Sequence, residues 1–486
     1  MSIALRRNEF NTDARDGGHA VSSSSSSNQS TNALPMNEHE IAQQLQQLVL
    51  DTVAPANEEP ANEEPAENAE SFQTSQSATL TRINPLNGPE TQSSDATWNF
   101  LTNAAQMFAR SSEISEVTQT EIRRGFDAQG YQWNGQELQR SMYMEYRREV
   151  YPQYHGIAHD PRAVRKQGRC VDPTQEFYKL RYSVTGSNYR CKISHFQLRD
   201  LIWATSNYDV YYWHMDGIQR WNPWLKTRTC VMGRREMPAG FRLSALCVDQ
   251  GVMLAGDYQG RVCARPLWTP DAQVAVGQVA GGTDIVNHAT PANRREGGNV
   301  VSLAVNSGSV DTFDMQRMAV VGSATFEWAV NCTAISDSGS VGCVVGDSLQ
   351  NALVDPRQGY RRIGELQGHK DYSFACAISP DERQVATGSQ DSSVRVYDVR
   401  WPRDALASLC GYLGAMRVVK FSSCGRFLLA AEPADYLHVY ETGLYDRSQD
   451  LEFMGEIAGA TFSPDCLFVG ISDAVHENML AEYALL

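Results

Sequence analysis

The most regular alternation of apolar and polar residues lies between positions 368 and 400. Three segments within it, 374–379, 384–389 and 394–399, carry apolar residues at every second position, which is the pattern of half-buried β-strands. Turn residues separate them, as in the run Ser379-Pro380-Asp381. This stretch therefore predicts three consecutive short strands joined by turns.

The same pattern recurs along the C-terminal half of the chain with a fixed period. Acidic residues that close the third strand of each set are separated by 41, 43 and 43 residues: Asp314, Asp355, Asp398 and Glu441. Serines that open the first turn of each set are separated by 43, 43 and 41 residues: Ser336, Ser379, Ser422 and Ser463. Two independent landmarks that keep one period indicate a repeat architecture.

One repeat carries dipeptides that resemble a known family. Gly368-His369 opens it and Tyr397-Asp398 closes it, where the repeat of the WD-repeat family opens with Gly-His and closes with Trp-Asp. The resemblance implies an all-β fold, a seven-bladed β-propeller in which each repeat is one blade. It also implies that a set of polar side chains forms the internal hydrogen-bond network of this blade: His369, Thr387, Ser389, Asp391 and Tyr397. We interpret this set as a packing device rather than a hydrolase triad, because buried polar groups must find partners.

Strand triplets predict the blade limits Arg190–Trp213, Arg242–Arg265, Asp284–Asp314, Ala329–Asp355, Tyr372–Val399, Ala415–Glu441 and Glu456–Tyr483. The last triplet ends within three residues of the C-terminus and leaves no room for a fourth strand. The alternating segment 177–182 precedes the first blade and can supply that strand. We therefore expect an N-terminal strand to complete the C-terminal blade and close the ring.

Longer strings resemble a narrower group. FDAQGYQWNGQELQRSMYMEYRREVYPQY, ISHFQLRDLIWATSNYDVYY, AEPADYLHVYET and GEIAGATFSPD are similar to a poorly characterised, transducin-like family of plant and fungal WD-repeat proteins. The resemblance runs from about Phe126 to the C-terminus. It implies a propeller and a scaffolding role, with no known chemistry.

Composition divides the chain into three parts. Residues 1–120 carry 5 Lys+Arg against 16 Asp+Glu and are rich in Ser, Glu and Pro, so they predict a disordered acidic tail. Residues 121–169 are basic and aromatic, and Leu138, Met142 and Tyr146 share one face of a predicted helix. Residues 170–486 make up the predicted propeller. We expect the arginines of the connector to pair with local acids and with the acidic tail, with nucleic-acid contact as the alternative.

One short segment of the tail has a second interpretation. Its apolar positions fall on one helical face and resemble a leucine-rich nuclear export motif: Ile41, Leu45, Leu48 and Leu50. A transient helix without a partner is the alternative. The location expected for the protein is the cytoplasm, the nucleus or both.

Charge and cysteine usage exclude several classes of function. The net charge is -15 and the tail carries most of it, so the near-neutral remainder lacks the basic face of a nucleic-acid binder. The 11 cysteines include no CxxC pair, which favours reduced thiols inside a core over disulfides or zinc. The sequence contains no phosphate-binding glycine loop and no apolar run long enough for a membrane span. We therefore expect no enzymatic activity, no cofactor, no metal and no membrane partner.

Two sets of residues are candidates for binding other proteins. Tyr397-Asp398-Val399-Arg400 resembles the Trp-Asp-x-Arg box that contacts the adaptor of cullin-type ubiquitin ligases, with Asp398 and Arg400 in place and Tyr397 where the box has Trp. Trp213, Trp221 and Trp224 are candidates for an aromatic recess, and packing between blades is the alternative. The sequence thus predicts a non-catalytic scaffold for protein or peptide partners, with a ubiquitin-ligase substrate receptor as the alternative function.

Overall fold

The structure of the protein is a computed structural model that describes residues 115–133, 140–151, 154–195, 197–249, 251–267, 269, 272–292, 300–472 and 478–486. The candidate export motif at Ile41, Leu45, Leu48 and Leu50 lies outside these residues. Within these residues, three helices precede the main body of strands: α3 (Gln119–Arg123), α4 (Arg140–Val150) and α5 (Pro161–Gln167). No helix in the described ranges has the length and apolarity that crossing a membrane requires.

Five sheets contain four antiparallel strands each, and we number them as blades in chain order. Blade 1 consists of β3 (Ile202–Ser206), β4 (Asp209–His214), β5 (Gly217–Asn222) and β6 (Thr227–Gly233). Blade 2 consists of β7 (Leu243–Asp249), β8 (Val252–Asp257), β9 (Arg261–Pro266) and β10 (Ala275–Gln278). Blade 3 consists of β11 (Val286–Ala292), β12 (Val300–Val305), β13 (Ser309–Asp314) and β14 (Ala319–Thr325). Blade 4 consists of β15 (Val330–Ile335), β16 (Gly342–Gly346), β17 (Asn351–Asp355) and β18 (Arg361–Leu366). Blade 5 consists of β19 (Ser373–Ile378), β20 (Gln384–Ser389), β21 (Ser393–Asp398) and β22 (Trp401–Cys410).

The remaining strands form one eight-stranded sheet. Its strands are β1 (Glu116–Val117), β2 (Tyr178–Thr185), β23 (Val418–Phe421), β24 (Phe427–Ala431), β25 (Ala434–Glu441), β26 (Ser448–Phe462), β27 (Cys466–Ser472) and β28 (Met479–Leu485). The first part of β26 pairs with β25, and its last part, from Glu456 on, pairs with β27. Gly455 lies at the junction with a φ of +119°, a conformation that glycine adopts at low cost. Divided there, the sheet contains blade 6 (β23 to the start of β26) and blade 7 (the end of β26, β27, β28 and β2).

The predicted closure of the ring by an N-terminal strand is confirmed. β2 pairs antiparallel with β28, with Tyr178 opposite Leu485 and Thr185 opposite Met479. Trp221 of blade 1 packs against this last blade, with its ring 6.3 Å from that of Tyr182 and 6.2 Å from that of Phe468. The closing contact is therefore both a strand pairing and an aromatic core.

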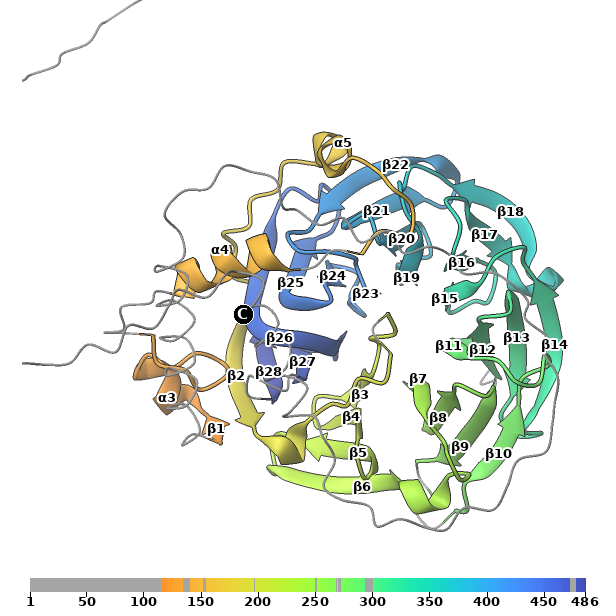
Figure 1. The fold of residues 1–486 in the computed structure, drawn as a ribbon, viewed down its shortest axis with the longest axis horizontal. Helices are drawn as coiled ribbons and strands as arrows, with labels where there is room; N and C mark the ends of the chain where they lie inside the picture. The colour runs from red at the N-terminus through yellow and green to blue at the C-terminus, as the bar shows by residue number, and fades with distance from the viewer. Residues whose placement is uncertain are drawn as a thin grey trace, which may run out of the picture. The chain divides into compact units, whose positions relative to one another are not determined.

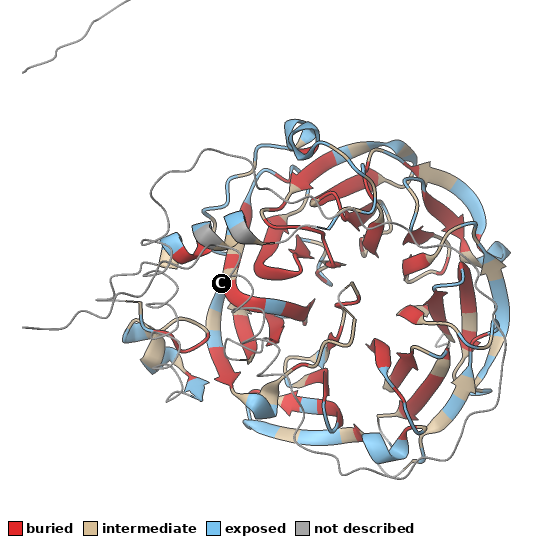
Figure 2. Ribbon diagram, in the orientation of Figure 1, coloured by how far each residue is buried: buried red, intermediate tan, exposed pale blue. Residues whose placement is uncertain are grey.

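The blades stand side by side around a central axis, and the innermost strands of neighbouring blades contact each other all the way round (Figure 1). Inner and middle strands are buried, whereas outer strands such as β6 and β14 expose many of their residues (Figure 2). This distribution follows from the sequence, because sheets that are apolar on both faces must pack face to face to remove those side chains from water. We call the face on which the innermost strands begin the upper face, and the opposite one the lower face.

The predicted limits of the first blade are wrong. Residues 190–200 contain no strand, and Asn207 lies between the first and second strands rather than between the second and third. Cys191 and Leu198 are buried all the same. Their alternation thus reflects packing of an irregular segment against the core and not pairing in a sheet.

The limit of the predicted tail at residue 120 is also wrong, because ordered structure begins earlier. Val117 of β1 is fully buried where it pairs with β2. Thr118 caps α3 and forms a capping box with Glu121. An added strand and a capped helix therefore fix the segment from residue 115 on.

Helix α4 packs on blade 6 through its arginines. Arg147 Nε lies 2.7 Å from Asp435 Oδ2, and Arg140 Nη1 lies 2.6 Å from Glu452 Oε2. Arg148 stacks over the Tyr436 ring at 4.9 Å. These arginines of the connector therefore pair with acids of the propeller, whereas the sequence suggested local acids and the acidic tail as their partners.

Candidate functional site

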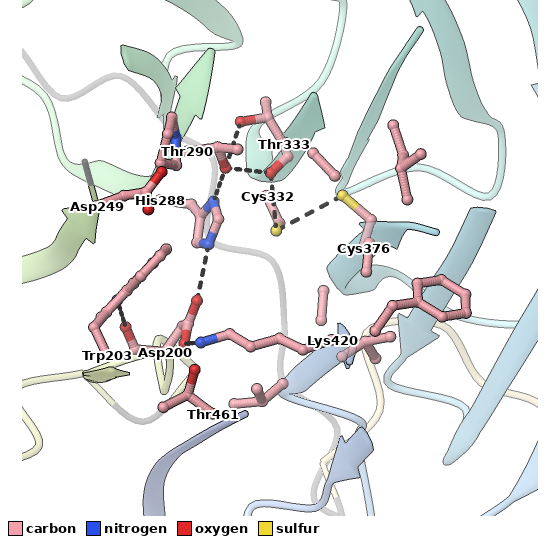
Figure 3. Close-up of a pocket in the computed structure, with 18 of the residues that line it drawn as sticks. Asp200, Trp203, Asp249, His288, Thr290, Cys332, Thr333, Cys376, Lys420 and Thr461 are labelled. Atoms are coloured by element: carbon pink, nitrogen blue, oxygen red, sulfur yellow. Dashed lines mark hydrogen bonds and ion pairs between the residues drawn. The ribbon is translucent and has the colours of Figure 1, made fainter. Parts of the chain in front are cut away.

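A cavity of about 420 Å³ lies at the centre of the ring and is lined by the innermost strands of all seven blades. Its polar side chains come from separate blades and converge across the space (Figure 3). Lys420 Nζ lies 2.6 Å from Asp200 Oδ1 and 4.5 Å from the centre of the Trp203 ring. Asp200 Oδ2 lies 3.3 Å from His288 Nε2. The carboxylate of Asp200 thus bridges two basic groups inside the channel.

The hydrogen bonds around His288 indicate that it is protonated on both nitrogens. Thr290 Oγ1 donates to the carbonyl of Thr333 at 2.5 Å, so its oxygen can only accept from His288 Nδ1, 3.1 Å away. On the other side, Nε2 faces the carboxylate of Asp200. Burial opposes this charge, but the nearby Cys332 and Asp200 outweigh burial and raise the pKa of His288 to about 10.

Two cysteines of neighbouring blades meet in the wall of this cavity. The sulfurs of Cys332 and Cys376 lie 3.7 Å apart, and the thiol of Cys376 donates toward Cys332. Burial alone would favour the neutral thiol, but the contact with Cys376 and the charge of His288 lower the pKa of Cys332. The carboxylate of Asp200 lies between the imidazole of His288 and the ammonium of Lys420, so it supplies a counter-charge inside the cavity.

A different arrangement occupies the end of this central cavity, or channel, at the upper face. We call this end the upper mouth. The Arg417 side chain is only 5 % exposed, its Nη2 donates to Gln390 Oε1 at 2.8 Å, and its guanidinium lies 4.2 Å from the Phe374 ring centre. Its Nε and Nη1 have no hydrogen-bond partner among the described residues. Burial, and then the nearby Arg199, lower the pKa of Arg417 to about 9, which still leaves it charged at neutral pH.

More cations lie on the upper face of blades 1 and 2. None of four basic residues there has an ion pair within the described part of the chain: Arg190, Lys192, Arg234 and Arg242. Burial, and then the charges of the three arginines, lower the pKa of Lys192. The upper face of these blades therefore carries basic side chains without an acidic partner among the residues described, alongside the acids Asp216 and Glu236.

The structure brings the predicted network of blade 5 together. His369 Nε2 lies 2.8 Å from Thr387 Oγ1, and His369 Nδ1 lies 3.1 Å from Asp391 Oδ2. Asp391 N donates to Ser389 Oγ at 3.1 Å, and Tyr397 donates to the carbonyl of residue 367 at 2.8 Å. All five side chains are buried within the blade, so the set holds strands together.

The tryptophans predicted as an aromatic recess do not share one surface. Trp213 and Trp221 are 1 % and 0 % exposed and belong to the core around blade 1, so the packing alternative applies to them. Trp224 is 72 % exposed and lies 6.4 Å from the Tyr208 ring at the lower face. Of the three, only Trp224 is available to a partner.

The predicted adaptor-contacting residues lie at the lower face. The Arg400 side chain is 71 % exposed and forms two hydrogen bonds with the Asp398 carboxylate, at 2.9 and 2.6 Å. Trp401 beside it is 75 % exposed. The box and the next residue therefore present a charged and an aromatic side chain to solvent. Two of the guanidinium's donors are already hydrogen-bonded to Asp398.

The residues of the channel were not among those predicted from the sequence. A signal for Arg417 exists, because one position of the innermost strands recurs at intervals of 44, 43 and 43 residues: Asn287, Asn331, Phe374 and Arg417. Arg417 is the charged member of that series. The cluster around His288 has no such signal, because its members occupy different positions in different repeats.

Comparison with known proteins agrees with this geometry. A model of the family described as WD domain, G-beta repeat matches residues 360–398. The fold is a WD40 β-propeller. A solved structure titled "Crystal Structure of Mitotic Checkpoint Complex" has a similar fold over 65 % of this chain and 95 % of its own, with a TM-score of 0.54 and 13 % identity. The WD40 β-propeller domain of Doa1 is similar over 63 % of this chain and 97 % of its own, with a TM-score of 0.51 and 16 % identity. No curated protein matches the WD40 propeller described here in sequence.

Proposed function

We propose that this WD40 propeller is a protein-interaction scaffold that binds an acidic segment of a partner protein at the upper mouth of its channel. The fold supports a protein-interaction role in general, and WD40 propellers are typically non-catalytic. The observation that carries the proposal is Arg417, a buried cation whose Nε and Nη1 have no hydrogen-bond partner among the described residues.

Nε and Nη1 of Arg417 are buried donors without an acceptor among the described residues, and such donors destabilise the protein. A buried donor without an acceptor costs about 1–3 kcal/mol, and more when the group is charged. A carboxylate that enters the mouth supplies acceptors and a counter-charge at once. The cations of the upper face at Arg190, Lys192 and Arg242 attract the same ligand over a longer range and accelerate its association.

The test uses two fluorescent peptides, one of alternating Glu and Ser and one with Gln in place of each Glu. We expect the full-length protein to bind the acidic peptide and Arg417→Gln to bind it at least tenfold more weakly, since Gln lacks the charge. Arg317→Gln is the matched control, because the Arg317 side chain is 75 % exposed at the lower face. Equal affinity for both peptides, or equal loss in both variants, would contradict the proposal.

The second candidate function is the ubiquitin-ligase substrate receptor. It is favoured by the exposed pair Arg400 and Trp401 at the lower face. If it is correct, the adaptor co-purifies with the wild-type protein and Arg400→Ala loses it while the fold persists. Absence of the adaptor from the wild-type complex would remove this candidate and leave the first one untouched.

A further inference from the structure

A second cluster of polar side chains lies on the upper face, where the segment between α4 and α5 meets blade 5. His155 and His159 come from that segment, and their rings stand nearly perpendicular with centroids 4.7 Å apart. Asp371 comes from the residues just before β19, and its side chain is fully buried. The backbone N–H groups of Gly156 and Ile157 donate to its two carboxylate oxygens at 2.9 Å each. The carboxylate thus holds the loop that carries both imidazoles.

The arrangement leaves ligand atoms free. His155 Nδ1 is buried and has no hydrogen-bond partner among the described residues. His159 Nδ1 lies 2.8 Å from the carbonyl of Ile157, which places its proton there and leaves Nε2 with a lone pair. Asp371 Oδ1 accepts from Ile157 and Tyr372, whereas Oδ2 accepts from Gly156 alone. Each of the three side chains therefore retains one unused acceptor or ligand atom.

The spacing suits a small cation rather than direct hydrogen bonds. Asp371 Oδ2 lies 3.9 Å from His155 Nδ1, beyond hydrogen-bond distance. One ligand atom from each residue lies within 4.8 Å of the others. Zinc sits about 2.0–2.2 Å from nitrogen and oxygen ligands, so its ligand atoms are somewhat closer than this, and small side-chain rotations close the difference. A cavity of about 20 Å³, the size of one ion or water, lies against both rings and is also lined by Asp391 and Arg165, while Asp371 lies outside its lining.

No lysine or arginine in the described ranges lies within ion-pair distance of the Asp371 carboxylate. We propose that His155, His159 and Asp371 form a site for one divalent transition-metal cation, of the kind that takes Zn²⁺, and that this cation fastens the loop to blade 5. Two imidazoles and one carboxylate favour such borderline metals over Mg²⁺ and Ca²⁺, which prefer ligand sets made of oxygen alone.

The test titrates untagged full-length protein, freed of metal by a chelator and kept reduced, with Co²⁺ and then with Zn²⁺. We expect one Co²⁺ per chain with visible absorption bands, displaced by Zn²⁺. His155→Ala and His159→Ala should each weaken binding at least tenfold. The matched control is His214→Ala, because His214 Nδ1 lies 3.2 Å from Asp216 Oδ2 and belongs to no metal-like cluster among the described residues.

Thermal unfolding supplies a second measurement that does not depend on the spectrum. Zn²⁺ should raise the Tm of the wild type and of His214→Ala but not that of His155→Ala, since a cation that binds only the folded state stabilises it. The absence of a Co²⁺ spectrum in the wild type would overturn the proposal. So would a sulfur-to-cobalt charge-transfer band, which points to cysteines, or equal binding in all variants.

Discussion

Blades 5 and 6 both bury a histidine against carboxylates, but they build the arrangement from different positions. In blade 5, Asp391 accepts the N–H of Lys370 at 2.8 Å and faces His369. In blade 6, Glu432 Oε2 accepts the N–H groups of Leu413 and Gly414, at 2.6 and 2.8 Å. Each carboxylate satisfies the buried backbone that leads into an innermost strand.

The histidines differ in the partners of their two ring nitrogens. In blade 6, His438 has a carboxylate on each side, with Nε2 3.0 Å from Glu432 Oε1 and Nδ1 2.8 Å from Asp450 Oδ1. In blade 5, His369 faces a carboxylate on one side and the hydroxyl of Thr387 on the other. The comparison teaches that the buried N–H groups impose the requirement for a carboxylate, while the residues that meet it vary.

The largest expected effect comes from removing the carboxylate of blade 6. Glu432→Ala leaves His438 with one buried partner fewer and leaves the N–H groups of residues 412–414 without their acceptors. We expect a loss of about 3–5 kcal/mol in the free energy of unfolding, measured by urea denaturation. Asp391→Ala should cost less, because two backbone N–H groups rather than three lose their acceptor, those of Lys370 and Ser393, together with the Ser393 hydroxyl and His369. The reverse order would contradict the comparison.

The next effect is the response of blade 6 to alkaline pH. Burial opposes the charge of His438, but Asp450 and Glu432 outweigh it and raise the pKa of His438 to about 9. The folded state then holds this proton more tightly than the unfolded state, whose histidine pKa is about 6.5. Stability from this group is complete below pH ~6.5 and is lost as the pH rises toward 9, by a total on the order of 3 kcal/mol.

Thermal unfolding between pH 6 and pH 9.5 measures this dependence, and His438→Gln should flatten it. Some slope should persist in the variant, because the raised pKa of His288 acts in the same direction. An unchanged slope in His438→Gln would show that the histidine of blade 6 is not charged.

Blade 5 should respond to acid instead. Burial disfavours the charged form of Asp391, yet the charge of His369 and the hydrogen bonds from His369 and Ser393 hold its pKa well below the usual range. The stability that this carboxylate contributes is present above pH ~4 and is lost as the pH falls through its folded pKa. Asp391→Asn should therefore lose less stability than the wild type between pH 5 and pH 3. Parallel curves for the two proteins would argue against an ionised Asp391.

The smallest effects come from single hydroxyls, one in each blade. Thr387→Val removes the partner of His369 Nε2, and Tyr412→Phe removes the hydrogen bond to Asp450, at 2.6 Å. Each should cost about 1 kcal/mol, which is the usual net value of a buried hydrogen bond. Matched melting curves for the two variants measure the difference, and a cost above that of Asp391→Ala for either would reverse the ranking.

Much of the fold followed from the sequence because its signals are local or periodic. The alternation in residues 374–399 predicted the strands of blade 5, and the closing strand at residues 178–185 followed from a triplet that lacked a partner. Blade 1 was misplaced because the apolar residues of 190–200 are buried without pairing. The alternation of apolar and polar residues shows which positions are buried. It distinguishes a strand from an irregular buried segment only when the alternation continues without a break.

The candidate sites were harder to predict, since they form from residues distant in the chain. Asp200, His288 and Cys332 come from three blades, and their spacing in the sequence does not predict that their side chains converge. Glu432 occupies no position of the repeat signature, so the network of blade 6 was not predicted. The network of blade 5 was predicted because the Gly-His and Asp positions of the repeat define it.

The pairing of β2 with β28 has a consequence for the order in which the protein forms. A ribosome produces Thr185 long before its partner Met479, so the nascent chain carries an unpaired edge strand through most of translation. Early blades can assemble one by one as they emerge, but the ring stays open until the final strand is released. Until then, the unpaired edge of β2 is open to pairing with neighbouring chains. Synthesis that stops short of residue 479 yields a product in which this edge stays unpaired.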